Sequence, residues 1–445
     1  MSAASPGLDT VSLRRPGRVM AIGLSVVLGT LALGVAMAWQ IVLPVFRFAH
    51  PSGPYEIGTL TYHWVDTNRL EIFGVDRNAR RELMVQIWYP ANGNASSPRA
   101  PYIQDAEAVT RAFARLHHKP AFAFRQLKAV TTNAIRSAPA VSGDTSFPVL
   151  LFLEGATGYR QMNTFQVEEL VSHGYVVVAL DQPGAAADIV FPDGRHAAAL
   201  PVEQLKALIR PSYMARARTP LVNGDALTDS SIIPYLAQDA VFALDQLTAL
   251  NHADPNGILT GRLDLSRVGA LGVSLGGIVV AEACRLDPRL GACLMMDAAV
   301  PMEVVKAGLK KPGMWMTRDA DSMRLERQRS GGWPEAEIEA HQSSMRAAFE
   351  GLASAGYFVQ LRGAFHFNFT DIPLWSPLTS WLGLTGPIDG QRAHSIINAY
   401  SLAFFDRHLK GLPAALLDGP GAQYPEVLFE AGQPSSPQYL KDADR

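Results

Sequence analysis

Ser274 lies in a short glycine-flanked segment whose pattern could present a nucleophile. The letters GVSLG occupy positions 272–276, an apolar run at 265–271 precedes them, and an apolar helical pattern follows. A strand, a sharp turn and a helix in this order hold a serine in a strained conformation and lift its hydroxyl out of the sheet. Gly272 and Gly276 are expected because a Cβ at either position would collide as strand and helix pack. The alternative is a glycine-rich strand–helix turn with an uninvolved serine.

A serine hydroxyl becomes a useful nucleophile when a base takes its proton and a carboxylate orients that base. The histidines that follow Ser274 in the chain are His341, His366, His394 and His408. Three of them lie inside helical patterns, whereas His366 directly follows an apolar strand pattern at 357–361 and stands in a loop. We therefore expect His366 to be the general base and acid. The alternative is a histidine that caps the strand end.

The orienting carboxylate has two candidate positions. Asp297 ends the strand pattern at 290–296, and Asp319 and Asp321 follow the strand pattern at 313–317. In α/β hydrolases the triad follows the chain order serine, acid, histidine, which either position satisfies. Most aspartates at strand ends cap helices or belong to loops, and this is the alternative for each of them. The residues themselves leave the choice open.

An attacked carbonyl would also need two backbone N–H groups for its developing oxyanion. One should come from Leu275, directly after the serine, and the other from the loop after the first central strand, at Gly155 and Ala156. Because backbone groups suffice, side-chain identity constrains these positions weakly.

The elements that must position these residues alternate regularly. Strand patterns occur at 147–153, 175–180, 265–273, 290–296, 313–317 and 357–361, and helix patterns at 165–173, 232–250, 334–353 and 390–409. This alternation predicts an α/β fold with a mainly parallel, doubly wound sheet and right-handed crossovers. Ligands in such sheets bind beyond the carboxyl ends of the strands, so the candidate side chains can meet at one rim.

Other segments are less regular. The N-terminal part predicts antiparallel strands at 59–64, 69–73 and 82–89, and residues 104–140 look partly helical. Residues 184–233 show no clear period. We expect them to form a lid, a binding loop or a disordered insertion within a catalytic domain that spans 54–430.

The N-terminal segment predicts a route out of the cytoplasm. Arg14, Arg15 and Arg18 precede an apolar run at 19–43, which is long enough to span a bilayer. The arginines favour a cytoplasmic tail at 1–18, a transmembrane signal anchor at 19–43, and a catalytic domain on the periplasmic or extracellular side. One alternative is a secreted protein, because Ala36 and Ala38 form a small-x-small cleavage site. Another is a buried N-terminal helix.

Composition and residue spacing argue against a nucleic-acid-binding, metal-binding or cofactor-dependent protein. The 445 residues carry a formal net charge of −2, so no basic field exists to hold nucleic acid. No His-x-x-x-His, Cys-x-x-Cys or phosphate-loop spacing is present, so we expect neither a metal nor another cofactor. His117 and His118 are expected at the surface, because adjacent helical side chains do not share a face. Cys284 and Cys293 are expected to be buried free thiols, although their spacing does not exclude a bridge.

Several longer stretches together resemble one family. They are GPYEIGT at 53–59, RELMVQIWYP at 81–90, TFQVEELVSHGY at 164–175, GVSLGG at 272–277 and GAFHFNFTD at 363–371. Over roughly 54–410 the chain resembles the plasma-type (isoform II) platelet-activating factor acetylhydrolase family of serine-dependent α/β hydrolases. The resemblance implies an α/β-hydrolase fold and favours Asp297 over Asp319 as the acid. It also implies that Ala156 and Leu275 donate the oxyanion N–H groups.

The resemblance implies an activity as well. We expect a serine carboxylic-ester hydrolase that acts through Ser274, without a cofactor, on phospholipids with short or oxidised sn-2 acyl groups. A domain held beside a bilayer by its N-terminal helix suits such amphiphilic substrates. The nearest alternative is a general short-chain or polyester esterase. The alternative from another class is a catalytically silent fold that binds lipid or a partner protein.

One departure from the family concerns Glu154. The family usually has histidine at this position, directly before the oxyanion loop, and this chain has glutamate. A carboxylate aimed at a developing oxyanion would oppose the reaction. We therefore expect Glu154 to point away from the oxyanion or to pair with a cation.

Overall fold

The computed structural model describes residues 42–432, apart from 94–96, 144, 215–220, 223–224 and 227–230. The expected cytoplasmic tail at 1–18 and nearly all of the expected anchor at 19–43 therefore lie outside the described residues. Within those residues, no helix combines the length and the apolar character that a membrane crossing needs.

The described strands build a large sheet of eleven members in the order β15-β14-β13-β12-β11-β5-β6-β2-β1-β4-β3. Neighbours from β6 to β14 run parallel, whereas β2 joins β6, β1 joins β2 and β15 joins β14 antiparallel. This confirms the predicted mainly parallel sheet with antiparallel N-terminal strands. In chain order the members are β1 (Glu56–Leu70), β2 (Arg80–Ala91), β3 (Arg99–Pro101), β4 (Thr131–Arg136), β5 (Phe147–Leu153), β6 (Val176–Asp181), β11 (Leu263–Val273), β12 (Leu290–Met296), β13 (Gly313–Thr317), β14 (Gly356–Leu361) and β15 (Val427–Gly432).

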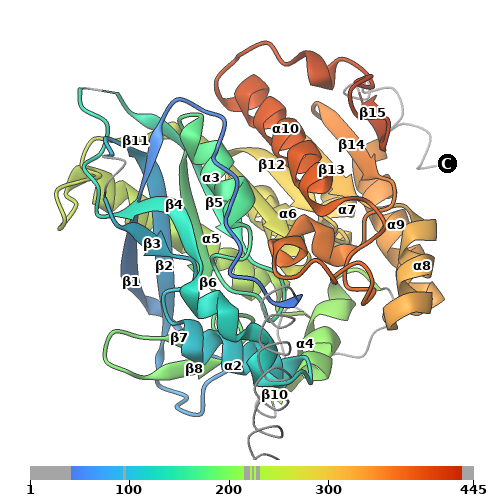
Figure 1. Cartoon of the computed structure of the whole chain (residues 1–445), viewed down its shortest axis with the longest axis horizontal. Helices are drawn as coiled ribbons and strands as arrows, with labels where there is room; N and C mark the ends of the chain where they lie inside the picture. The colour runs from blue at the N-terminus through green and yellow to red at the C-terminus, as the bar shows by residue number, and fades with distance from the viewer. Residues whose placement is uncertain are drawn as a thin grey trace, which may run out of the picture.

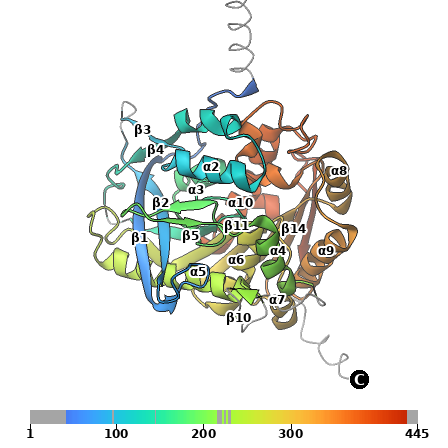
Figure 2. The ribbon, with the colours of Figure 1, turned by 90° about the horizontal axis from the view of Figure 1, so that it is seen from below.

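Helices cover both faces of this sheet (Figures 1 and 2). One face carries α3 (Thr164–Ser172) and α10 (Gly390–Leu409), and the other carries α5 (Ile233–His252), α6 (Leu275–Leu286) and α9 (Glu335–Glu350). The central strand β5 shows why, because every residue of its sequence FPVLLFL is buried. Leu150 and Phe152 enter the core beneath α3 and α10, and Leu151 enters the core on the opposite face. Burial on both faces is typical of a central strand in a parallel sheet.

Several segments differ from the sequence prediction. β1 runs unbroken to Leu70, so 69–73 is not a separate strand, and Arg69 instead forms an ion pair at 2.7 Å with the buried Asp239. The segment at 104–140 contains α2 (Ala106–Leu116), the 3-10 helix η1 (Ala121–Ala129) and the unpredicted strand β4. The helix α8 (Ala320–Ser330) was missed because its inward side chains include Ser322 and Glu326, so no hydrophobic period reveals it.

The segment at 184–233 is not a loop throughout. Its described parts contain β7 (Asp188–Val190), β8 (His196–Ala198), α4 (Val202–Ile209), η2 (Arg210–Ser212), β9 (Leu221–Val222) and β10 (Asp225–Ala226). Elements this short contain too few residues to show a period, although Leu205 and Leu208 of α4 enter the core. Ala187 donates its N–H to Gly158 O at 2.8 Å, in the loop after β5. The described start of the segment therefore lies beside the carboxyl end of that strand, the end that Figure 2 shows from outside.

A disulfide joins Cys284 of α6 to Cys293 of β12. The expectation of free thiols was wrong. A short turn after α6 folds β12 back along the helix, and this brings the two Cα atoms to 6.6 Å. That distance is within the range that a bridge requires. The packing of helix on strand, which a sequence spacing does not reveal, decides the pairing.

Candidate active site

Ser274 occupies the predicted turn between β11 and α6. Its backbone has φ 57° and ψ −122°, in the positive-φ region that residues with a side chain rarely adopt. Its N–H donates to Met296 O at 2.9 Å, which ties the turn to β12. A Cβ added at Gly276 would overlap the backbone of Leu153, and one added at Gly272 would overlap the backbone of Gly276. The strand–turn–helix prediction and the need for both glycines are confirmed.

Asp297 and His366 are in direct contact. Asp297 directly follows β12, and His366 begins the 3-10 helix η3 (His366–Phe369) soon after β14. The ring of His366 donates from Nδ1 to Asp297 Oδ2 at 2.5 Å. The Thr317 hydroxyl donates to the other carboxylate oxygen at 3.0 Å. The Asp297 side chain is fully buried and the His366 side chain is 17% exposed, so the imidazole has a buried partner and an open edge.

The structure brings Ser274 to the same rim. β11 and β12 are parallel neighbours in which Val273 pairs with Met296, so Ser274 and Asp297 each follow the last paired residue of their strand. Because parallel strands present their carboxyl ends at one edge, the serine turn and the Asp297–His366 pair lie together at that edge. Ser274, like His366, is partly exposed to solvent.

The other candidate residues have structural roles. Asp319 caps α8, because its carboxylate accepts the Ser322 N–H at 2.6 Å. Asp321 has an exposed side chain and forms an ion pair with Arg324. Asp319 is thus a helix cap, which was the alternative to a catalytic role in the sequence analysis. Of the remaining histidines after Ser274, His341 is buried in α9, His394 stacks on Phe165 at 3.7 Å, and His408 contacts Tyr357.

Two backbone N–H groups near the turn have no backbone acceptor among the described residues. Leu275 is the first residue of α6, so its N–H has no acceptor within the helix. In the loop after β5, Thr157 donates to Ala185 O and Gly158 donates to Gly155 O. Among the described residues, the intervening Ala156 N–H donates to no backbone carbonyl. A Cβ at Gly155 would lie 3.3 Å from the Cβ of Ser274, which shows how closely this loop approaches the serine.

Comparisons with known proteins show a similarity to one family of esterases. The family described as platelet-activating factor acetylhydrolase, isoform II, matches residues 42–212. A probable 1-alkyl-2-acetylglycerophosphocholine esterase from Arthroderma benhamiae is 25% identical over 306 residues, which cover 63% of this chain and 66% of that protein. The platelet-activating factor acetylhydrolase of Cavia porcellus is 22% identical over 385 residues, which cover 83% of this chain and 81% of that protein. The chain is thus similar to the platelet-activating factor acetylhydrolase, isoform II, family over its N-terminal part and to individual acetylhydrolases over more of its length.

A solved structure extends the likeness to most of the fold. The ferulic acid esterase from Streptomyces cinnamoneus matches with a TM-score of 0.65 and 26% identity, and the match covers 86% of this chain and 99% of that esterase. An esterase neighbour and a mainly parallel sheet with helices on both faces fit the α/β-hydrolase fold. The chain is therefore a serine-type carboxylic-ester hydrolase.

Arg318 is a site residue that sequence reasoning missed. It directly follows β13, and its Nε lies 2.9 Å from Asp297 Oδ2, with both side chains fully buried. Burial by itself raises the pKa of Asp297, but the Arg318 charge and the hydrogen bond from His366 outweigh it and hold that pKa well below its ordinary value. Asp297 is therefore an anion. An arginine after a strand carries no sequence signal for this contact, because the partner lies on another strand.

Glu154 is a buried carboxyl directly before the loop that carries Ala156. Its Oε1 accepts the Gln182 N–H at 3.0 Å at the end of β6. Burial, with a further contribution from Asp181, raises the pKa of Glu154 well above its ordinary value. Among the described residues no cation pairs with it, so the pairing that we expected as one possibility is not formed. The raised pKa favours the protonated carboxyl, which carries no charge that would oppose an oxyanion.

His117 is not a plain surface histidine. Its Nε2 lies 3.0 Å from the Thr157 hydroxyl, in the loop that carries Ala156. Burial lowers the pKa of His117 to about 4, so the ring is neutral at pH 7. His118 is exposed, as the sequence analysis predicted for both His117 and His118. The surface prediction was wrong for His117 because α2 packs its C-terminal end against the β5–α3 loop, a contact that helical spacing cannot show.

Proposed function

We propose that this ester hydrolase releases short or oxidised sn-2 acyl groups from phospholipids. In this proposal Ser274 is the nucleophile, His366 the general base and acid, and Asp297 the orienting carboxylate. The observation that carries it is the hydrogen bond from His366 Nδ1 to Asp297, beside the strained turn at Ser274. The substrate class comes from the activities for which the relatives are named, an acetylhydrolase and an acetylglycerophosphocholine esterase.

The proposed reaction follows from the hydrogen bond between His366 and the ionised Asp297. Because Nδ1 of His366 donates to Asp297, Nε2 is the nitrogen that can accept the Ser274 proton. The serine oxygen attacks the ester carbonyl, and the N–H groups of Ala156 and Leu275 hold the oxyanion, each worth about 3–4 kcal/mol of barrier. The intermediate collapses when His366 protonates the leaving lysophospholipid alcohol. Water, activated by the same imidazole, then hydrolyses the acyl-enzyme and restores the serine.

A cavity of about 730 Å³ supports a role of the 184–233 segment in acyl binding. Most of its lining is apolar and comes from this segment, from α7 (Met302–Ala307) and from α9, with Tyr213, Met214, Met302, Val305 and Ala347 among the residues. Ala340 on its wall precedes His341, a buried side chain that interacts with Asp297. We assign the distal part of the acyl group to this cavity.

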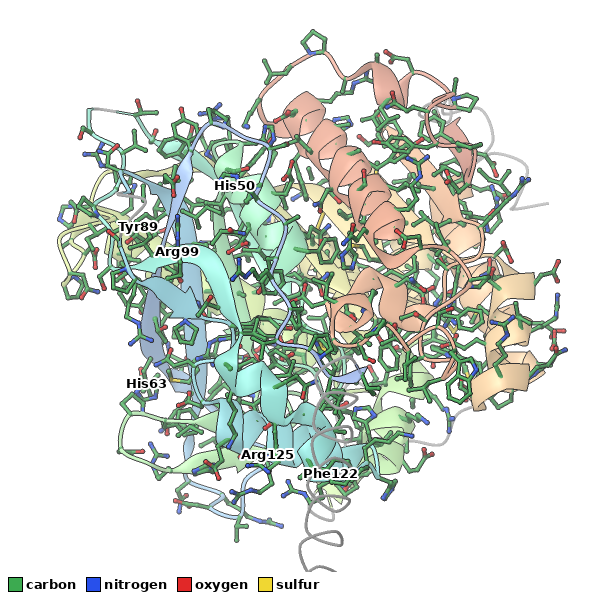
Figure 3. The ribbon with its side chains drawn as sticks, in the orientation of Figure 1. His50, His63, Tyr89, Arg99, Phe122 and Arg125 are labelled. Carbon is green, nitrogen blue, oxygen red and sulfur yellow. A yellow bond between two sulfur atoms is a disulfide. The ribbon has the colours of Figure 1, made fainter. Side chains whose placement is uncertain are left out.

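Exposed apolar side chains support contact with a lipid surface. Ser376 donates its hydroxyl to Val42 O at 2.5 Å, so the loop at 375–389 lies beside the point where the N-terminal segment joins the domain. In that loop Trp381 is 81% exposed and Leu382 is 51% exposed. An edge-on aromatic contact joins the same loop to η1, whose Phe122 is also exposed and lies in the lower part of Figure 3. Large exposed apolar side chains on neighbouring elements can insert into a lipid surface, so we assign membrane contact to this loop and η1.

The location of the protein is part of the proposal. We place the catalytic domain on the periplasmic or extracellular side, held by a signal anchor at 19–43 or released by cleavage. The Cys284–Cys293 bridge supports export, because disulfides persist in oxidising compartments. Alkaline extraction of membranes, together with sequencing of the mature N-terminus, distinguishes the retained anchor from the cleaved signal.

A second candidate function is hydrolysis of soluble esters of aromatic acids. The observation that favours it is the match to nearly the whole length of a ferulic acid esterase. A catalytically silent fold that binds lipid or a partner is the candidate from another class. These candidates differ in what they predict for turnover, so one set of assays separates them.

The deciding experiment measures ester hydrolysis by the wild type and by Ser274→Ala. We expect the wild type to hydrolyse p-nitrophenyl butyrate and the variant to lose at least about a thousandfold in kcat, because the nucleophile is absent. A fluorophosphonate probe should label the wild type at Ser274. Equal, slow hydrolysis by both proteins would favour the silent fold. A higher kcat/KM for ethyl ferulate than for an acetyl or oxidised phosphatidylcholine would favour the soluble esterase.

A further inference from the structure

The contact on Asp297 continues into a buried row of charges that the mechanism above does not use. Arg318 faces Asp297 on one side and forms an ion pair with Glu326 of α8 on the other. The side chains of Asp297 and Arg318 are fully buried, and that of Glu326 is 9% exposed. When His366 is protonated, the row therefore alternates in sign from the imidazolium through Asp297 and Arg318 to Glu326.

An aromatic ring covers this row. The guanidinium of Arg318 lies 5.5 Å from the centre of the Trp333 ring, and the His366 ring lies 5.9 Å from the same ring. Trp333 and the packed helices α8 and α9 keep water away from the charges. Charges in such surroundings interact more strongly than charges at a solvated surface.

We propose that Arg318 and Glu326 are positioning residues that act through Asp297 and set, in opposite directions, the pH range in which His366 can accept the serine proton. This inference rests on the proposed role of His366 as general base. Arg318 is attracted to the carboxylate that also holds the imidazole, so it offsets part of the negative charge that stabilises the imidazolium. Glu326 in turn offsets part of the Arg318 charge.

The direction of each effect follows from the charges. Removing the positive charge of Arg318 leaves Asp297 free to stabilise the imidazolium, so His366 should keep its proton to higher pH. Removing the negative charge of Glu326 leaves Arg318 uncompensated, so His366 should lose its proton at lower pH. A nearby charge within a few ångströms shifts a pKa by roughly one to three units, and a more distant one by less.

The other groups around the row do not reproduce this pattern. His341 of α9 interacts with Asp297 and Arg318, but burial lowers its pKa to about 4, so it is neutral in the working range. Asp319 interacts with Arg318 from the start of α8, where it is held as the helix cap. The Thr317 hydroxyl donates to Asp297 and carries no charge.

The test compares Arg318→Gln and Glu326→Gln with the wild type in two measurements. The first is the pH profile of kcat/KM for a p-nitrophenyl ester. The second is an NMR titration of labelled histidine, with His366→Asn to assign the signal, which follows the imidazole without requiring turnover. We expect Arg318→Gln to move the acid limb and the His366 titration up by about one pH unit, and Glu326→Gln to move both down by about half a unit. The matched control is Glu335→Gln, which removes a 41%-exposed carboxylate that pairs with Arg324 and Arg327.

Every outcome of these two measurements either supports or contradicts the proposed roles of Arg318 and Glu326. Opposite shifts for the two variants, with none for the control, support the inference. Unshifted titrations, or shifts of the same sign, would show that Arg318 and Glu326 serve stability alone. If Arg318→Gln fails to fold, the downward shift in Glu326→Gln remains decisive, because this variant keeps the size of the side chain. If Ser274→Ala and the wild type are equally inactive, the proposed function fails, and the NMR titrations still test the charge row.

Discussion

At the scale of single residues, surroundings decide what a buried carboxyl can do in this protein. Glu154 and Asp297 both lie in the site, yet their pKa values move in opposite directions. Burial raises the pKa of Glu154 and so favours its protonated form, whereas Arg318 and His366 keep Asp297 ionised in spite of burial. A neutral acid can stand beside an oxyanion, and an anion can hold an imidazolium. The two roles therefore come from neighbouring charges rather than from residue type.

This contrast makes a prediction for matched amide variants. Glu154→Gln should keep ester hydrolysis within about threefold of the wild-type rate at pH 7, because glutamine can still accept the Gln182 N–H and removes no charge. Asp297→Asn should lower kcat by about 10⁴-fold, because it removes the charge that orients and stabilises the imidazole. Steady-state kinetics with p-nitrophenyl butyrate compare the two variants. A loss of about a hundredfold or more in Glu154→Gln would mean that Glu154 works as an anion.

At the scale of elements, α6 and β12 connect the stability of the fold with its site. α6 begins directly after Ser274, and β12 ends directly before Asp297. The disulfide between Cys284 and Cys293 ties these two elements together. Any motion of the helix relative to the strand would change the distance between the proposed nucleophile and the acid. The bridge thus restrains the pair of elements whose ends the reaction uses.

Removing the bridge should therefore cost stability. We expect the double variant Cys284→Ala, Cys293→Ala to lose about 2–3 kcal/mol in the free energy of unfolding, because a closed loop of this length no longer restricts the unfolded chain. Urea unfolding of both proteins, with and without a reductant, measures this loss of stability. The reductant should shift the wild-type midpoint and leave the double variant unchanged. Equal midpoints for the untreated and the reduced wild type would contradict the prediction.

At the scale of the whole molecule, buried histidines make stability depend on pH. His341 and His394 are buried, and burial lowers the pKa of each to about 4, from an ordinary value near 6.5. Between these values the unfolded chain binds protons that the folded chain does not bind. The free energy of unfolding is therefore not reduced by these residues above about pH 6.5, and it decreases as the pH falls from 6.5 toward 4. Each contributes up to roughly 3 kcal/mol to this loss.

A variant of His394 tests this dependence. His394→Gln can still donate to Thr370 O, the acceptor of the native ring at 2.8 Å, but it cannot take up a proton. We expect the variant to be somewhat less stable than the wild type at pH 7, because it loses the ring that stacks on Phe165. Its free energy of unfolding should fall less steeply between pH 6.5 and 4 than that of the wild type. Urea midpoints across this range provide the measurement, and parallel curves for the two proteins would refute the assignment.

The amino-acid sequence by itself determined the alternation of strands and helices, the turn at Ser274 and the position of His366 after a strand. These features are local, because hydrophobic period, chain order and the space that a glycine leaves are set within about twenty residues. For the same reason the helix at 390–409 was predicted with the bounds that the structure has. Where inward side chains were polar, as in α8, or elements were very short, as in 184–233, the local pattern was absent.

The tertiary structure alone decided which aspartate meets His366, what Arg318 faces, why the pKa of Glu154 is raised and whether the cysteines pair. Asp297 and His366 are 69 positions apart, and the resemblance to a family, not the spacing, favoured Asp297 beforehand. Contacts of this kind depend on which strands become neighbours in the sheet and on how deeply each side chain is buried. Both are set by the packing of the whole chain, because the free energy of a buried charge depends on every group around it.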